Sequence, residues 1–171
     1  MQEQRIETAR LTLRAPQALD AAEVQRLAGD FRIADVTGSI PHPYPPELAQ
    51  QWIERCVQGW ASGAAANFVI IESDSGQLIG SMSLENITRG EAEVGYWIGV
   101  PYWSRGYASE ACNALVDFAF RQLRLRRLHA SHLARNPQSG RVLFKAGFRH
   151  LGLGHSASGE PMELYERVSG E

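Results

Sequence analysis

A glycine-containing segment at the start of a helix could bind an anion through its backbone. The N–H groups of a first helical turn have no partners within the helix, and the helix dipole adds partial positive charge there. Gly106 has no side chain, so a phosphate group could approach this backbone closely. The segment consists of Ser104, Arg105, Gly106, Tyr107, Ala108 and Ser109. A pyrophosphate fits this chemistry, although ordinary helix starts have a similar composition.

Two common nucleotide-binding motifs are absent from this segment. No lysine followed by serine or threonine comes after Gly106, which disfavours a P-loop nucleotide hydrolase. No Gly-x-Gly-x-x-Gly pattern is present, which disfavours a dinucleotide-binding fold. A further signal is therefore needed to name the ligand.

The histidines form no metal-binding motif. His129 and His132 fall in one strand-like segment, and their odd spacing places them on opposite faces. His150 and His155 have no cysteine or carboxylate companions at ligand spacing. We therefore predict that the protein binds no metal.

The charge of the chain argues against a nucleic-acid partner. The net charge is −2, without the basic excess that is typical of nucleic-acid binding. One basic cluster extends from Arg121 to His129. It could bind an anion, but its pattern favours a solvated helix end followed by a strand.

The length and the termini predict one domain that does not enter a membrane. A chain of 171 residues suits a single domain spanning residues 1–171. The first residues are polar and lack a signal-peptide core, and no apolar run is long enough to cross a membrane. Cys56 and Cys112 lie in apolar helical patterns, as expected for buried, reduced thiols. These features predict a cytoplasmic protein.

The first part of the chain predicts one strand and two helices. Residues 9–16 alternate between apolar and polar and stop at a proline, as a strand would. Asp20 is expected to cap a short helix ending near Gly29. The proline-rich residues 38–47 should form a loop, and a second helix should start at Pro46. Its apolar stripe would consist of Leu48, Trp52, Cys56 and Trp60.

The rest of the chain predicts strands interrupted by two helices. Strands are expected at residues 68–73, 77–87, 91–100 and 127–133, followed by two more around a turn at residues 158–159. Helices are expected from the glycine-containing segment to Leu123 and from Asn136, as N-cap, to Gly147. The order β-α-α-β-β-β-α-β-α-β-β predicts an α+β fold. Its mixed, mainly antiparallel sheet would have six to seven strands and about four flanking helices.

Two segments together carry a resemblance to a known family. "EVGYWIGVPYWSRGYASEA" is followed, one helix and one strand later, by "NPQSGRVLFKAGF". With these motifs the chain resembles the GCN5-related N-acetyltransferase (GNAT) superfamily, and within it the RimJ/RimL-type ribosomal-protein N-acetyltransferases. The resemblance covers nearly the whole chain and implies the GNAT fold.

The resemblance implies that acetyl-coenzyme A binds between the strands at residues 91–100 and 127–133. The pantetheine amides would pair with the backbone of Ile98, Gly99 and Val100. The pyrophosphate would lie on the backbone N–H groups of Ser104, Arg105, Gly106, Tyr107, Ala108 and Ser109. In the family motif Gln/Arg-x-x-Gly-x-Gly/Ala, Trp103 replaces the first residue. This change removes a side-chain contact and leaves the backbone site intact.

Acetyl transfer to an amine needs a base for the amine and a proton for the leaving thiolate. By resemblance Glu93 is the candidate base and Glu85 the alternative, although either could be an ordinary strand residue. Many family members use a tyrosine as acid where this chain has Phe144, which could pack on the cosubstrate but cannot donate a proton. Ser139 matches the serine proposed as the acid in RimJ/RimL-type relatives, and Asn136 would orient the cosubstrate amides. Both could instead serve only the helix start.

The leading hypothesis is an acetyl-CoA-dependent N-acetyltransferase that acts on a primary amine by direct attack in a ternary complex. The acceptor would be a protein N-terminus or a small amine, and the resemblance makes a homodimer plausible. The alternative is a sensor module that binds acetyl-CoA with little transfer, because the tyrosine acid is missing and Trp103 alters the motif. In a third hypothesis the glycine-containing segment only starts a helix, and coenzyme A does not bind.

Overall fold

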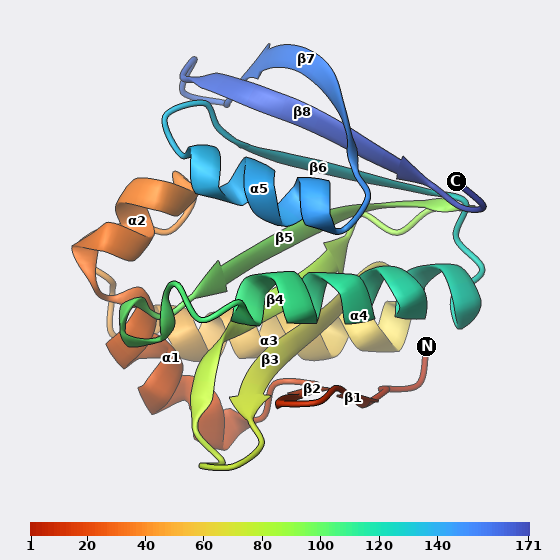
Figure 1. Cartoon of the computed structure of the whole chain (residues 1–171). Coiled ribbons are helices and arrows are strands. Elements are labelled where there is room, and N and C mark those ends of the chain that lie inside the picture. Colours follow the sequence, from red (N-terminus) through yellow and green to blue (C-terminus); the bar gives the residue numbers. More distant parts are fainter.

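The computed structural model describes residues 1–171 as one sheet with helices on both faces (Figure 1). The strands are β1 (Ile6–Glu7), β2 (Leu11–Arg14), β3 (Ala66–Glu72), β4 (Leu78–Glu85), β5 (Glu91–Ile98), β6 (Arg127–Leu133), β7 (Arg149–His155) and β8 (Pro161–Val168). The helices are α1 (Ala21–Ala28), α2 (Phe31–Thr37), α3 (Leu48–Ser62), α4 (Tyr107–Arg121) and α5 (Pro137–Lys145), with short 3-10 helices η1 (Ala18–Asp20) and η2 (Val100–Tyr102).

The sheet has the strand order β1-β2-β3-β4-β5-β6-β8-β7. Every neighbouring pair is antiparallel except β5 and β6, which run parallel because α4 carries the chain back along the sheet. This topology confirms the predicted α+β class with a mixed, mainly antiparallel sheet. The sheet has eight strands rather than six or seven because the two residues of β1 also pair with β2.

The helix α2 was not expected from the sequence patterns. The Asp30 carboxylate accepts a hydrogen bond from the Arg32 backbone N–H at 2.9 Å, and Gly38 ends the helix with φ 67°. Both residues are ordinary helix signals. The helix buries only Ile33 fully, so its apolar periodicity is too weak to reveal it. With α2 the protein has five α-helices rather than about four.

Two local expectations at α1 and α3 are wrong. The Asp20 side chain does not cap α1, because its oxygens accept hydrogen bonds from the Arg14 guanidinium and the Gln17 backbone N–H. A bidentate guanidinium is the stronger partner for a carboxylate. The helix α3 starts at Leu48 rather than Pro46. Its fully buried residues are Ala49, Ile53, Cys56 and Trp60, so only two residues of the predicted stripe are core residues.

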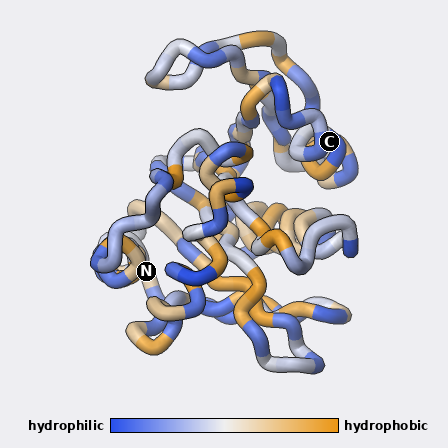
Figure 2. The backbone as a smooth tube through the Cα atoms, turned by 90° about the vertical axis from the view of Figure 1, so that its left-hand side faces the viewer, coloured by the Kyte–Doolittle hydropathy of each residue, from blue (hydrophilic) through white to orange (hydrophobic).

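The two faces of the central strands meet different helices, since side chains alternate along a strand. In Figure 1, α4 lies in front of the sheet and α1 and α3 lie behind it. Met82 and Leu84 of β4 belong to the core cluster that includes α4. Ser83 and Glu85 alternate with them and therefore point toward α3. Figure 2 shows hydrophobic stretches gathered in the central elements and hydrophilic stretches at the outer loops.

The parallel strands β5 and β6 pair over only part of their length. Their paired residues extend from Glu91 opposite Arg127 to Val94 opposite Ala130. Beyond Val94, β5 stays paired with β4, while β6 stays paired with β8. The strands therefore separate after Val94. This gap opens near the start of α4, between the two strands that the family resemblance implied as the walls of the cosubstrate site.

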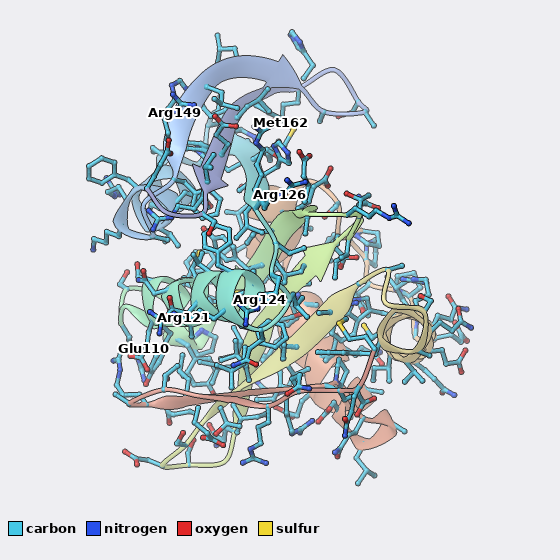
Figure 3. The ribbon with its side chains drawn as sticks, turned by 90° about the vertical axis from the view of Figure 1, so that its right-hand side faces the viewer. Glu110, Arg121, Arg124, Arg126, Arg149 and Met162 are labelled. Carbon is cyan, nitrogen blue, oxygen red and sulfur yellow. The ribbon has the colours of Figure 1, made fainter.

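The basic cluster lies at a solvated helix end. Figure 3 shows Arg121 and Arg124 at the end of α4 and Arg126 near the start of β6. Arg121 forms an ion pair with Asp117 at 3.8 Å, and both side chains are exposed. This agrees with the simpler interpretation of the cluster. No helix in the structure combines the length and the apolar character that a membrane span requires.

Candidate active site

A cavity of about 1110 Å³ passes through the gap between β5 and β6. Its walls come from the start of α4 and from α5 on one face of the sheet and from α3 on the other. The predicted site residues that line it are Glu93, Ile98, Ser104, Arg105, Gly106, Tyr107, Ala108, Ser109, Asn136 and Ser139. Ligand pockets are usually about 300–1,000 Å³. The cavity is therefore large enough for a cosubstrate and an acceptor together.

The segment of residues 104–109 presents a row of free backbone donors. None of its backbone N–H groups has an acceptor within the protein. Gly106 is the N-cap of α4 with φ 79°, and it makes no side-chain capping bond. Ser104 also has positive φ, at 62°. This backbone turns its N–H groups outward to the cavity, which is the arrangement that an anion requires.

Residues of β1–β2 and β3 support this segment, and the sequence patterns did not reveal them. The Arg10 guanidinium donates to the Arg105 carbonyl at 2.9 Å and to the Glu110 carboxylate at 2.8 Å. The Tyr107 hydroxyl donates to Glu72, so this side chain points into the protein and leaves only its backbone to the cavity. The Arg10 contacts join residues 95 and 100 positions apart in the chain, and the Tyr107–Glu72 contact joins residues 35 positions apart. No local pattern could have predicted them.

The free edge of β5 differs from the expected one. Gly99 donates its N–H to the Ile79 carbonyl at 2.7 Å and accepts from the Tyr102 N–H at 2.9 Å. The Val100 carbonyl accepts from the Trp103 N–H at 3.2 Å. The Gly99 N–H and the carbonyls of Gly99 and Val100 are therefore bonded within the free protein, and the expected pairing of Gly99 and Val100 with the pantetheine stays a prediction. Alternation along β5 directs the N–H groups of Tyr96 and Ile98 toward the gap instead.

Trp103 now has a structural explanation. Its indole N–H donates to the Ile98 carbonyl at 2.6 Å, and its side chain is 38% exposed at the cavity. The indole therefore occupies one acceptor of the β5 edge in the free protein. Trp103, which departs from the family motif, therefore makes a hydrogen bond within the protein instead of the ligand contact that the family residue would make.

Two carboxylates face the cavity from the α3 side. Glu85 and Glu93 are directly opposite each other on β4 and β5. Glu93 is exposed and accepts a hydrogen bond from the Asn86 amide at 3.3 Å. Glu85 is half-buried, and its desolvation raises its pKa, with the charge of Glu93 adding to the effect and Arg55 opposing it. Both candidates for the base therefore lie at one end of the cavity, and the raised pKa makes Glu85 a stronger base than an ordinary glutamate.

The α5 side of the cavity carries the candidate acid. Asn136 is at the N-cap position of α5, but its side chain makes no capping bond. Its amide N–H donates to the Ser139 hydroxyl oxygen at 3.0 Å. The hydroxyl of Tyr96, on β5, lies beside Ser139 and is buried without a hydrogen-bond partner. The sequence patterns did not indicate Tyr96 as a site residue. The only signal for its position is the alternation of side chains along β5.

Phe144 lies outside the cavity. Its side chain is 77% exposed and borders a separate hollow between α5 and β8. It follows Leu143, which is the buried residue of α5, so Phe144 points to another side of the helix. The expected packing of Phe144 on the cosubstrate is therefore not supported.

The histidines and cysteines take structural roles. His132 is buried between the Leu133 carbonyl and the Tyr165 hydroxyl, whereas His129 pairs with Glu91 at 3.1 Å. No group of three or more potential metal ligands is brought together. Cys56 and Cys112 are buried and free, and burial raises the pKa of each thiol to about 12. Neither thiol is ionised at neutral pH, so neither is a ready nucleophile.

Comparison with known proteins agrees with this geometry. A family profile described as "Acetyltransferase (GNAT) domain" matches residues 10–149. The N-acetyltransferase p20 of Bacillus licheniformis is 30% identical over 148 residues, which cover 85% of this chain and 83% of that protein. The ribosomal protein uS5-alanine N-acetyltransferase of Escherichia coli is 29% identical over 93 residues, or 53% of this chain and 48% of that enzyme.

The fold has solved counterparts as well. The structure of Mycobacterium smegmatis RimJ in complex with a coenzyme A disulfide matches with a TM-score of 0.81 at 22% identity, covering 98% of this chain and 87% of that one. This likeness concerns the fold, while the profile and p20 concern the sequence. Together with the parted strands and the free N–H groups at α4, they show that the chain belongs to the GNAT family of N-acetyltransferases.

Proposed function

We propose that this N-acetyltransferase moves the acetyl group of acetyl-coenzyme A to a primary amine. One observation carries the proposal: the free N–H groups of residues 104–109 and the unpaired edge of β5 open into the same cavity. An anionic group on the helix start and amides along the strand edge fit these two features. Acetyl-coenzyme A carries both, and its thioester would supply the acyl group.

The residues of the cavity have distinct proposed roles. The backbone of residues 104–109 and Arg105 would hold the pyrophosphate, while Ile98 and Asn136 would orient the pantetheine amides. On the α3 side, Glu93 or Glu85 would take a proton from the amine. On the α5 side, Ser139 would give a proton to the leaving sulfur. The amine would then attack the carbonyl carbon from the α3 side of the gap.

Direct attack in a ternary complex is the mechanism that the thiols support. Cys112 is fully buried in the core beneath α4, and Cys56 is buried under α3. With both pKa values raised to about 12, an acetyl-cysteine intermediate has no suitable nucleophile. Buried, reduced thiols also suit the cytoplasmic location that we expect.

The acceptor is proposed by analogy with relatives. The Escherichia coli relative acts, by its name, on the alanine of ribosomal protein uS5. A protein N-terminus and a small primary amine are therefore the two acceptor classes to test. The sensor alternative depends on the absence of a donor at Phe144, whereas Ser139 offers a hydroxyl inside the cavity.

The proposal can be tested with purified protein, acetyl-coenzyme A and a panel of acceptors. The panel contains peptides with N-terminal alanine or serine, free amino acids and small amines. We expect thiol release with at least one acceptor, a 42 Da mass increase of that acceptor (about the mass of an acetyl group replacing one proton), and thermal stabilisation by coenzyme A. Stabilisation without thiol release would favour the sensor alternative. No stabilisation and no release would contradict both.

A further inference from the structure

The Tyr96 hydroxyl is a buried polar group whose role the proposed mechanism leaves open. It is shielded from solvent and has no hydrogen-bond partner in the protein. Buried hydroxyl groups without partners are uncommon in native structures, and each needs an explanation. Because Tyr96 also lines the cavity, a ligand atom could supply the missing partner.

The position of Tyr96 on β5 places it at the separation of the two parallel strands. It comes two residues after Val94, the last residue of β5 that pairs with β6. Tyr96 is opposite Met82 on β4, and both pack with the core cluster beneath α4. Its side chain therefore faces α4 and α5, on the side of the sheet opposite to Glu85 and Glu93.

The hydrogen bonds around Tyr96 leave its proton free. The Asn136 amide donates to the Ser139 oxygen at 3.0 Å, and the Ser139 hydroxyl lies near enough to Tyr96 to lower the Tyr96 pKa, although the two hydroxyl groups do not reach hydrogen-bonding geometry. The other titratable neighbours of Tyr96 are Cys112 on α4 and Tyr165 on β8. Tyr165 bonds to His132 at 3.0 Å, and the buried Cys112 thiol is a weak acceptor. No group in the protein forms a hydrogen bond with the Tyr96 hydroxyl, so its proton is free for a ligand.

We propose that the Tyr96 hydroxyl donates a hydrogen bond to the thioester sulfur and stabilises the negative charge that forms there. The inference rests on the proposed transfer reaction. As the amine nitrogen bonds to the carbonyl carbon, the carbon–sulfur bond breaks and its electron pair stays on sulfur. The amine proton passes to the α3-side carboxylate and then to water. A solvent proton reaches sulfur through the Ser139 hydroxyl, which takes up one proton as it releases another, while Tyr96 keeps its own.

The environment of Tyr96 suits a donor that does not ionise. Burial raises its pKa to about 12, so the hydroxyl stays protonated over the whole neutral range. A thiol ionises at about pH 8.5. A thiolate is therefore too weak a base to remove the Tyr96 proton. A strong, charge-assisted hydrogen bond is the result.

The variant Tyr96→Phe tests this role because it removes one oxygen atom and keeps the ring. We expect kcat to fall roughly 10- to 100-fold, the usual effect of one hydrogen bond to a developing charge, with little change in KM for the amine. The free variant should melt at the same temperature as the wild type or higher, since the lost hydroxyl had no partner. A merely structural hydroxyl would show the opposite pattern, with lower stability and unchanged kcat.

A binding measurement separates this inference from the proposed function. Calorimetry is done with coenzyme A and with desulfo-coenzyme A, which lacks the sulfur, between pH 7 and pH 10. In the wild type, coenzyme A should gain about tenfold in affinity over its desulfo analogue as the thiol ionises, an effect of one pKa unit. Tyr96→Phe should lose this gain. If the variant keeps the gain and its kcat stays within twofold, the inference is wrong even though the enzyme transfers acetyl groups.

Tyr165→Phe is the matched control. Tyr165 is a neighbour of Tyr96, but its hydroxyl has a partner in His132 and the residue lies outside the cavity lining. This variant should lose thermal stability and keep both its kcat and its preference for coenzyme A. A fall in kcat equal to that of Tyr96→Phe would assign the effect to general disturbance and overturn the inference.

Discussion

At the residue scale, the candidate base and acid lie on opposite faces of one sheet. Glu85 and Glu93 point toward α3, whereas Ser139 and Tyr96 are on the side of α4 and α5. The gap after Val94 connects the two faces of the sheet. In the proposed reaction, a proton can therefore leave the amine on the α3 side while another proton reaches the sulfur on the α5 side. The base and the acid do not exchange a proton directly.

The raised pKa of Glu85 leads to a prediction for the pH profile. The carboxylate is active as a base only when ionised, so kcat/KM should fall as the pH drops below its raised pKa. Glu85→Gln should lower kcat/KM about 100-fold or more and abolish this acidic limb. Glu93→Gln removes the neighbouring charge, lowers the pKa of Glu85, and should move the limb to lower pH. Steady-state rates from pH 5 to pH 9 distinguish the variants.

The same variants have a stability signature. Because folding raises the pKa of Glu85, the folded state disfavours its charged form, and stability is lost as the pH rises through that pKa. Glu85→Gln should therefore be more stable than the wild type at pH 7 and lose this advantage near pH 4, as thermal unfolding would report.

The pH–rate profiles also decide between the two carboxylates. If Glu93→Gln abolishes the acidic limb and Glu85→Gln does not, Glu93 is the base.

Gly106 gives the second residue-scale prediction. Its φ of 79° is strained for any branched side chain, and a Cβ there would lie 3.4 Å from the Arg10 guanidinium. Gly106→Val should destabilise the protein by about 1–3 kcal/mol and weaken coenzyme A binding at least tenfold, because the N–H groups of the segment are displaced. Unfolding in urea and calorimetry measure the two effects.

Gly159→Val is the matched control for that strain. Gly159 has φ 85°, a Cβ at this position would meet nothing within 4 Å, and the residue lies in the turn between β7 and β8. This variant should lose similar stability and bind coenzyme A normally. Equal loss of binding in both variants would show that strain, and not the site, explains the effect.

At the scale of elements, η2 decides which backbone groups of β5 remain free. It follows β5 directly, and its turn occupies the carbonyls of Gly99 and Val100, while the Gly99 N–H pairs with Ile79 of β4. The turn also brings the Trp103 indole back onto the Ile98 carbonyl. A ligand that pairs with this edge must therefore compete with an internal hydrogen bond.

Trp103→Phe tests this competition. Phenylalanine keeps an aromatic ring but has no N–H, so the Ile98 carbonyl becomes available. Coenzyme A should bind about two- to fivefold more tightly, the worth of one ordinary hydrogen bond. Tyr102→Phe is the control, because its hydroxyl bonds to Gln77 at 2.8 Å and leaves the β5 edge unchanged. Weaker binding by Trp103→Phe in calorimetry would mean that the indole contacts the ligand itself.

At the scale of the whole molecule, local patterns predicted the architecture well. Alternation along residues 68–100 and the helix signals at Gly106, Asn136 and Gly147 gave the order of the later elements. These features depend on residues close together in the chain, which is why the sequence reveals them. The site itself, where β5 meets α4, stays a prediction that the family resemblance supplied.

Features that depend on distant contacts could not be predicted. The support of Arg105 by Arg10 joins residues 95 positions apart, so it arises only after the chain has folded. The occupied backbone of Gly99 depends on the register of β4 against β5. The exposure of Phe144 depends on the side of α5 that packs on the sheet.

The separated strands lead to a prediction for the whole molecule. The part from β1 to β5 and the part from β6 to β8 share only the paired residues 91–94 and 127–130 within the sheet. A ligand in the gap contacts both parts, so it should rigidify both together. Hydrogen exchange with coenzyme A should show slower exchange at residues 95–98, 104–109 and 131–139. Residues 73–76 of the β3–β4 turn, which do not line the cavity, should be unchanged. Protection confined to one side of the gap would contradict a ligand that bridges the two parts.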